Sequence, residues 1–168
     1  MDFPWPAPNS TDPDRRLAKV VLSAVPGPSN IIADVLTMGE VEDADAYAGD
    51  DTVNIVSGDG DDSGMPLTLV VVGGASTMHP KLLATIPVGT EVRTPGPDKC
   101  SDMDRARNDG VTIFDADEDG TVRGFVVEWR SSPTEVSSQA FSYDPRTHAL
   151  VALAPPTIVA TCDDYAFA

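Results

Sequence analysis

From residue 52 onward, most of this chain consists of short apolar runs separated by turns. The runs are rich in β-branched residues, and the turns are rich in Asp, Gly and Pro, which favour chain reversal. The runs that we expect to form strands span residues 52–57, 66–72, 82–92, 111–114, 121–130, 141–143, 149–153 and 158–161. Short strands at this regular spacing pair with their sequence neighbours through tight turns. The pattern therefore predicts a mainly antiparallel β-sheet, a sandwich or a partial barrel.

The clearest predicted hairpin spans residues 111–130. Its first strand runs into the acidic turn 115–120, and the chain returns through residues 121–130. Successive side chains of a strand point to opposite faces, so Phe125, Val127 and Trp129 share one face of the returning strand. We expect this aromatic and β-branched face to be buried.

The N-terminal part of the chain predicts helix rather than strand. Residues 1–10 alternate Pro with aromatic and small residues and are expected to form an extended leader. Thr11 or Asp12 can cap a helix, Pro13 fits its first turn, and apolar residues then follow at helical spacing. Ser29 could cap a second short helix, although the β-branched residues in the range 31–36 also allow a strand.

Together these patterns predict an α+β chain with an N-terminal helix or helices followed by the antiparallel strands. Residues 11–168 are expected to form a single globular domain, because a chain of 168 residues is about one domain long. The range 82–92 is expected as two short pieces, since Pro87 and Gly89 interrupt it.

A formal net charge of -16 narrows the classes of partner. Such a surface repels the phosphates of nucleic acids and anionic lipids, and it attracts basic proteins. The longest apolar run, residues 67–72, suits a buried strand and is far shorter than the roughly 20 residues of a membrane-spanning helix. We therefore expect a protein partner, which could be basic, and neither nucleic-acid binding nor direct membrane insertion.

The two cysteines, Cys100 and Cys162, both lie beside polar, loop-like residues. A disulfide between them would close a long loop and stabilise the chain by roughly 4 kcal/mol in the chain-entropy model. It would also imply an oxidising compartment, hence an extracellular or cell-surface protein. The alternative is two unrelated thiols in a cytoplasmic protein or a virion component.

Two acidic turns carry the spacing of calcium loops. Asp115, Asp117 and Asp119 alternate before Gly120, an arrangement that can converge carboxylate oxygens on a cation. Position 12 of this loop is Val126 instead of the bidentate Glu of an EF-hand, so an EF-hand is excluded. The alternative is a polar hairpin tip that binds no metal.

The second acidic turn repeats this spacing with Asp59 and Asp61, followed by Ser63. Calcium is the one cofactor that these patterns indicate. The alternative is that a chain so rich in Asp produces the same spacing by chance.

Motifs of the common catalytic sites are absent from the sequence. There is no G-x-S-x-G, H-E-x-x-H, phosphate-binding loop or G-x-G-x-x-G, and His79 and His148 are expected to be solvated. These absences favour a non-catalytic chain without excluding an enzyme.

The leading interpretation is an extracellular or cell-surface protein-binding domain, such as the soluble part of a lipoprotein. The alternatives are a structural or assembly protein of the virion type, and an acidic inhibitor or immunity-type protein that neutralises a basic partner.

Overall fold

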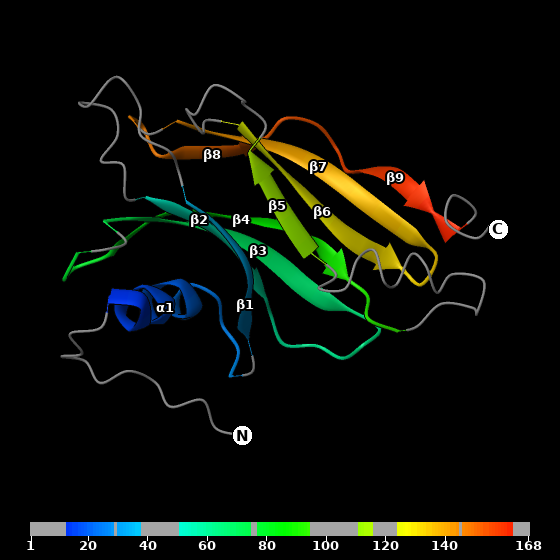
Figure 1. Ribbon diagram of the computed structural model, residues 1–168, viewed down its shortest axis with the longest axis horizontal. Helices are drawn as coiled ribbons and strands as arrows, with labels where there is room; N and C mark the ends of the chain where they lie inside the picture. Colours follow the sequence, from blue (N-terminus) through cyan, green and yellow to red (C-terminus); the bar gives the residue numbers. More distant parts are fainter. Residues whose placement is uncertain are drawn as a thin grey trace.

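The computed structural model describes residues 13–28, 30–37, 51–74, 77–94, 111–115, 124–144 and 146–162. Within these ranges the chain is mostly antiparallel β-structure, with the single helix α1 (Pro13–Ser23) near its start. Figure 1 shows two sheets stacked on one another, with α1 on the outer side of the first sheet. The leader predicted for residues 1–10 lies outside the described residues.

Both sheets are built largely from strands that are neighbours in sequence. The first sheet has the order β1 (Ile31–Thr37), β2 (Thr52–Ser57), β3 (Met65–Gly73) and β4 (Lys81–Glu91). The second has the order β5 (Val111–Asp115), β6 (Gly124–Ser132), β7 (Glu135–Asp144) and β8 (Ala149–Ala152), with β9 (Thr157–Thr161) also paired to β7. Strands β8 and β9 therefore share the outer edge of β7, each covering one part of its length.

The main core lies between the two sheets. Phe125, Val127 and Trp129 point into it, which confirms the face predicted from strand alternation. Phe125 and Phe141 stack across β6 and β7 with ring centroids 6.0 Å apart. On the first sheet, Ile55 and Leu69 supply part of the opposing apolar layer. Burial of both inner faces holds the sheets together.

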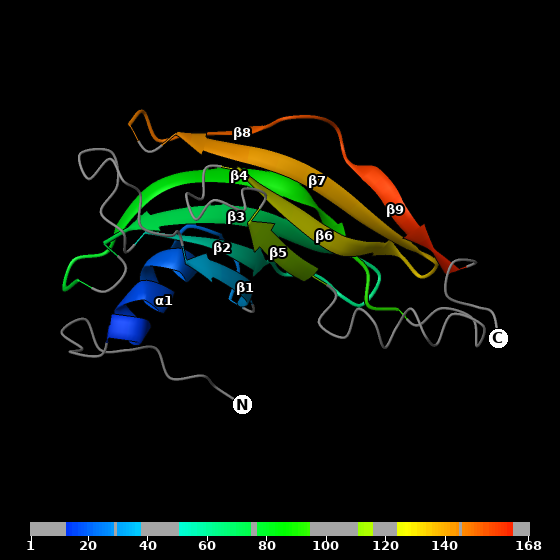
Figure 2. The ribbon, with the colours of Figure 1, turned by 45° about the horizontal axis from the view of Figure 1, so that its top comes forward.

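Helix α1 covers the outer face of the first sheet (Figure 2). Val21 and Val25 pack there against Val56, Val70 and Val72. With the helix on one face and the second sheet on the other, every residue of β2 is buried. In the described structure the first sheet is therefore the central layer, between helix α1 and the second sheet.

The C-terminal end of α1 is held by a side chain that follows it. Asn30 Nδ2 donates to the carbonyl oxygen of Leu22, in the last turn of the helix, at 3.1 Å and to that of Val25, just beyond the helix, at 2.6 Å. This contact ties the helix to the start of β1.

Three sequence predictions differ from the structure. The second helix that Ser29 could cap does not form: residues 31–37 form the strand β1, which is the alternative that their β-branched residues allowed. The two pieces expected within 82–92 form one continuous strand, β4, because Pro87 sits on an edge strand with a register shift nearby. Strand β7 begins at Glu135, well before the predicted residue 141, since pairing with β6 and β9 stabilises its polar Ser-rich half.

Polar contacts link the two sheets at their edges. Asp34 of β1 accepts the backbone N–H of Ile113 of β5 through Oδ2 at 2.8 Å. Beyond the end of β4, the N–H of Val92 donates to the carbonyl of Arg130 in β6 at 2.8 Å. These bonds satisfy edge groups that would otherwise need water, and they fix how the sheets are stacked.

Candidate protein-binding surface

The acidic turn after β2 is closed by its own side chains. Asp61 Oδ1 accepts two hydrogen bonds from Ser63, one from its hydroxyl and one from its backbone N–H at 2.9 Å. These bonds favour the carboxylate and lower the pKa of Asp61, with the hydroxyl bond as the largest cause. The carbonyl of Asp62 accepts the N–H groups of Arg93 at 2.7 Å and Thr94 at 2.8 Å, which pins the turn to the segment after β4.

Asp59, the other predicted ligand of this turn, lies in a different environment. A Cβ added at Gly27 would lie 2.8 Å from the carboxyl carbon of Asp59, so the Asp59 side chain fills the space beside this glycine. Gly27 also has a φ of 134°, a conformation that side-chain-bearing residues rarely adopt. Asp59 thus packs against the loop after α1, while Asp61 closes its own turn.

The calcium predictions stay predictions. Across the part of the chain that the structure describes, no group of three or more His, Cys, Asp or Glu side chains could hold a metal ion. Asp115 ends β5, but its side chain, together with Asp117 and Asp119, lies outside the described residues.

Cys162 is buried directly after β9, with 4% of its surface exposed. Its N–H donates to the carbonyl of Thr134 at 2.7 Å, so the chain is fixed where the cysteine occurs. No cysteine among the described residues is a free thiol, and Cys100 lies outside them.

Both histidines are exposed. His148 lies in the turn between β7 and β8 with a left-handed φ of 60°, and its ring stacks on Tyr143 at 6.4 Å. Burial raises the pKa of Tyr143 to about 12, with Asp51 and Asp144 adding to the effect, so this phenol stays neutral at physiological pH. The pair serves to pack this end of the second sheet.

Glu91, at the end of β4, is a fully buried carboxylate that sequence analysis missed. Its Oε1 accepts a hydrogen bond from Nη2 of Arg93 at 3.4 Å, whereas Oε2 has no hydrogen-bond partner. Burial is the main cause that raises the pKa of Glu91, and Arg93 offsets only part of the rise. Because Arg93 is 40% exposed, its attraction is weakened by water.

We expect Glu91→Gln to stabilise the protein at neutral pH by about 1 kcal/mol, because it removes a buried charge that is only partly compensated. A folded-state pKa above the unfolded value means that the favourable contribution of Glu91 is complete below its unfolded pKa. That contribution is lost as the pH rises through the folded pKa. The gain from Glu91→Gln should therefore be present at pH 7 and vanish near pH 4, as measured by urea unfolding at both pH values.

Glu135→Gln is the matched control for this experiment. The Glu135 side chain is partly exposed, so neutralising it should change the stability little at either pH. A loss of stability for Glu91→Gln at pH 7 would contradict the prediction, because it would show that the attraction between Glu91 and Arg93 outweighs the cost of burying the carboxylate.

The most unusual surface of the described chain is the segment of residues 149–161, which we call the edge segment. It contains no charged residue, although the chain has a net charge of -16. Residues 151–159 are all exposed, and the exposed fractions of Val151, Leu153, Ile158 and Val159 lie between 46% and 60%. Exposed apolar side chains that cluster in one segment are typical of interaction sites.

The edge segment is ordered although its middle is exposed. It is anchored at one end by Leu150, packed on the main core, and at the other by Ala160, packed on Val136. Between these anchors, Leu153 donates its N–H to the carbonyl of Ala140 at 2.9 Å, and Gln139 Nε2 donates to the carbonyl of Ala154 at 2.9 Å. A partner that binds here does not have to order this backbone first.

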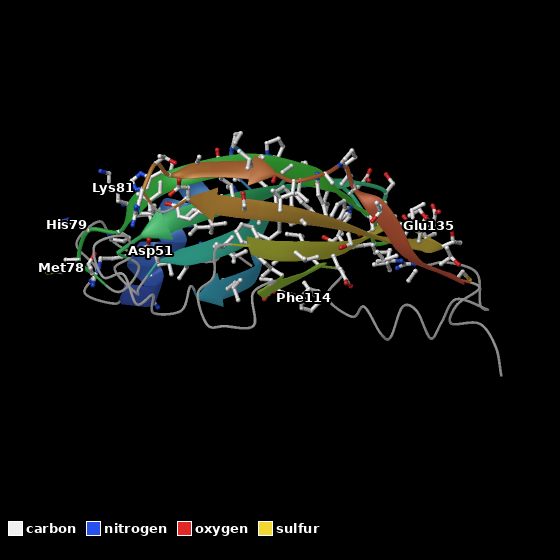
Figure 3. The ribbon with its side chains drawn as sticks, turned by 90° about the horizontal axis from the view of Figure 1, so that it is seen from above. Asp51, Met78, His79, Lys81, Phe114 and Glu135 are labelled. Atoms are coloured by element: carbon white, nitrogen blue, oxygen red, sulfur yellow. The ribbon has the colours of Figure 1, made fainter. Side chains whose placement is uncertain are left out.

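Carboxylates flank both ends of the edge segment. Asp144 pairs with Ala149, and Glu135 pairs with Thr161, both from the neighbouring strand β7. A backbone N–H from Arg146 is the main cause that lowers the pKa of Asp144, so this carboxyl is ionised at neutral pH. Figure 3 shows Glu135 beside the end of β9, whereas Asp51 lies at the other end of the molecule. The result is an uncharged strip with a carboxylate at each end, and Arg146 also lies near Asp144.

Comparisons with known proteins give no relative: no family model, curated protein or solved structure matches this chain. In the described residues, no helix is long and apolar enough to cross a membrane.

Sequence analysis predicted strands at 149–153 and 158–161 but did not identify this surface. The run of residues without charge could be read directly from the sequence. Its exposure could not, because the same apolar pattern is typical of buried strands.

Proposed function

We propose that this chain is a non-catalytic protein-binding domain that uses the edge segment as its contact surface. The observation that supports the proposal is the run of nine exposed residues, 151–159, none of them charged, on a strongly acidic chain. An apolar centre with a polar or charged rim is the usual anatomy of a protein interface. The acidic residues Asp144 and Glu135 at the two ends favour a partner whose apolar contacts are flanked by Lys or Arg.

A selection from a random peptide library displayed on phage tests this proposal. Immobilised protein should enrich peptides that combine apolar with basic residues. These peptides should lose about tenfold or more in affinity for Leu153→Asp, because the new charge would have to be desolvated in the contact.

Val35→Asp is the matched control, since Val35 is also exposed, at 43%, but lies on β1 of the first sheet. Equal binding to the wild type and to Leu153→Asp, or enrichment of acidic peptides, would overturn the proposal.

The compartment proposed for this domain is extracellular or cell-surface, because a Cys100–Cys162 disulfide would place the chain in an oxidising environment. Burial of Cys162 and the absence of a free cysteine among the described residues support this pairing. Thiol titration of the denatured protein without reductant should then find no reactive thiol. Two reactive thiols would remove the basis for this compartment.

The two alternatives make different demands on the same surface. An assembly protein would associate with copies of itself, whereas an acidic inhibitor would depend on charge more than on apolar contact. Binding that falls steeply with salt and is insensitive to Leu153→Asp would favour the inhibitor.

A further inference from the structure

The four edges of the two sheets are protected to different degrees. A strand edge carries unpaired N–H and C=O groups, and proteins blunt it with proline, bulges, charges or covering segments. In this structure β1 and β5 lie alongside each other, and the backbone N–H of Ile113 in β5 already donates a hydrogen bond to Asp34 in β1. Strand β4 carries Pro87, whose nitrogen has no hydrogen to donate to a further strand. Three of the edge strands therefore have an identifiable device against pairing.

The fourth edge is divided between two strands. Strand β8 is followed by Pro155 and Pro156, which cannot donate to a ladder. Strand β9, Thr157–Thr161, contains no proline, glycine or charged residue, and four of its five residues are β-branched. Its pairing with β7 has one register shift, which leaves Val159 without a partner residue on β7. Along one edge it pairs with β7, and no strand of the described ranges pairs with the other.

The exposure of β9 leaves room for a further strand. The side chains of Ile158 and Val159 are 56% and 49% exposed, so they are accessible beside the unpaired backbone. A five-residue strand of high β-propensity with an open edge is the usual acceptor in strand addition, where backbone hydrogen bonds supply affinity and alternate side chains supply specificity.

We propose that the outer edge of β9 accepts an extended segment of another protein, which pairs with the backbone of residues 157–160 and alternates apolar with basic side chains. This inference rests on the proposed function and names its mode of recognition. The basic character follows from Glu135, which lies beside the end of β9, and from the net charge of -16. The same net charge repels a second copy of this chain at physiological ionic strength.

The test uses three short synthetic peptides with the intact protein. The first alternates valine and lysine. The second replaces each lysine with glutamate. The third has the first sequence, with alternate backbone nitrogens methylated so that one edge of the peptide cannot donate hydrogen bonds. Binding is measured by calorimetry, and amide hydrogen exchange reports protection of residues 157–160.

We expect the valine–lysine peptide to bind and to slow exchange in β9, and the methylated and acidic peptides to bind about tenfold or more weakly. Ile158→Lys should weaken the valine–lysine peptide to a similar extent through charge repulsion. Val35→Lys, the same change on the first sheet, should leave its binding unchanged.

Three results would overturn the inference. Equal binding of the methylated peptide would show that side chains dock without strand pairing, and the proposed function would survive. No binding of the valine–lysine peptide, when the phage selection still returns binders sensitive to Leu153→Asp, would also reject strand addition alone. A dimer that forms at high salt and protects β9 would show that a second copy is the occupant.

Discussion

Phe125→Ala should lose about 3–5 kcal/mol of unfolding free energy, the largest effect that we expect from one substitution. Phe125 is fully buried between the sheets and stacks on Phe141. Truncation removes both the transfer free energy of the ring and its contacts, and it leaves a cavity that a two-sheet core cannot fully collapse. Urea unfolding followed by tryptophan fluorescence measures the change.

Phe114→Ala is the matched control in the same sheet. Phe114 is 41% exposed and lies on β5, where it points away from the core (Figure 3). Its truncation should cost under about 1 kcal/mol. Similar losses for both variants would contradict the register of β5 and β6, because a shift by one residue exchanges the two faces of a strand. If Phe125→Ala is too unstable to measure, Phe125→Leu should show a smaller loss in the same direction.

Gly89→Ala should destabilise the protein by about 1–3 kcal/mol, although a single methyl group is added. A Cβ at Gly89 would lie 2.6 Å from Cζ2 and 2.9 Å from Cε2 of Trp129. These are atoms of a nearly fully buried indole between the sheets, so either the ring or strand β4 must move. Thermal or urea unfolding of the variant gives the loss.

A double-mutant cycle with Trp129→Phe identifies the cause. Phenylalanine lacks the indole atoms that a Cβ at Gly89 would meet, so Gly89→Ala should cost less in the Trp129→Phe background. The coupling should be about 0.5–3 kcal/mol. Additive losses would show that Gly89 is required for its backbone instead of for its approach to Trp129.

Much of the fold could be read from local patterns. Strands β2, β3, β5 and β6 and the helix α1 follow from β-branched runs, turn residues and a helical apolar spacing. The burial of Phe125, Val127 and Trp129 follows from strand alternation alone. These features depend on interactions between near neighbours in sequence, which is why sequence analysis reached them.

The wrong predictions concern segments stabilised by distant partners. Residues 31–37 became a strand because they pair with β2, with residues as far away as Ser57. The Ser-rich half of β7 has little strand propensity of its own, but it is paired on both sides by β6 and β9. Long-range pairing overrides weak local preference in both places.

The sequence by itself determined an acidic, mainly antiparallel chain with a helix near its N-terminus, and it contained the uncharged run at residues 149–161. Only the tertiary structure decided that this run lies exposed at a sheet edge while the equally apolar β2 is buried on both faces. It also decided that Glu91 is buried. The reason is that side-chain composition sets the tendency to avoid water, whereas the stacking of sheets and helix decides which apolar strands obtain a cover.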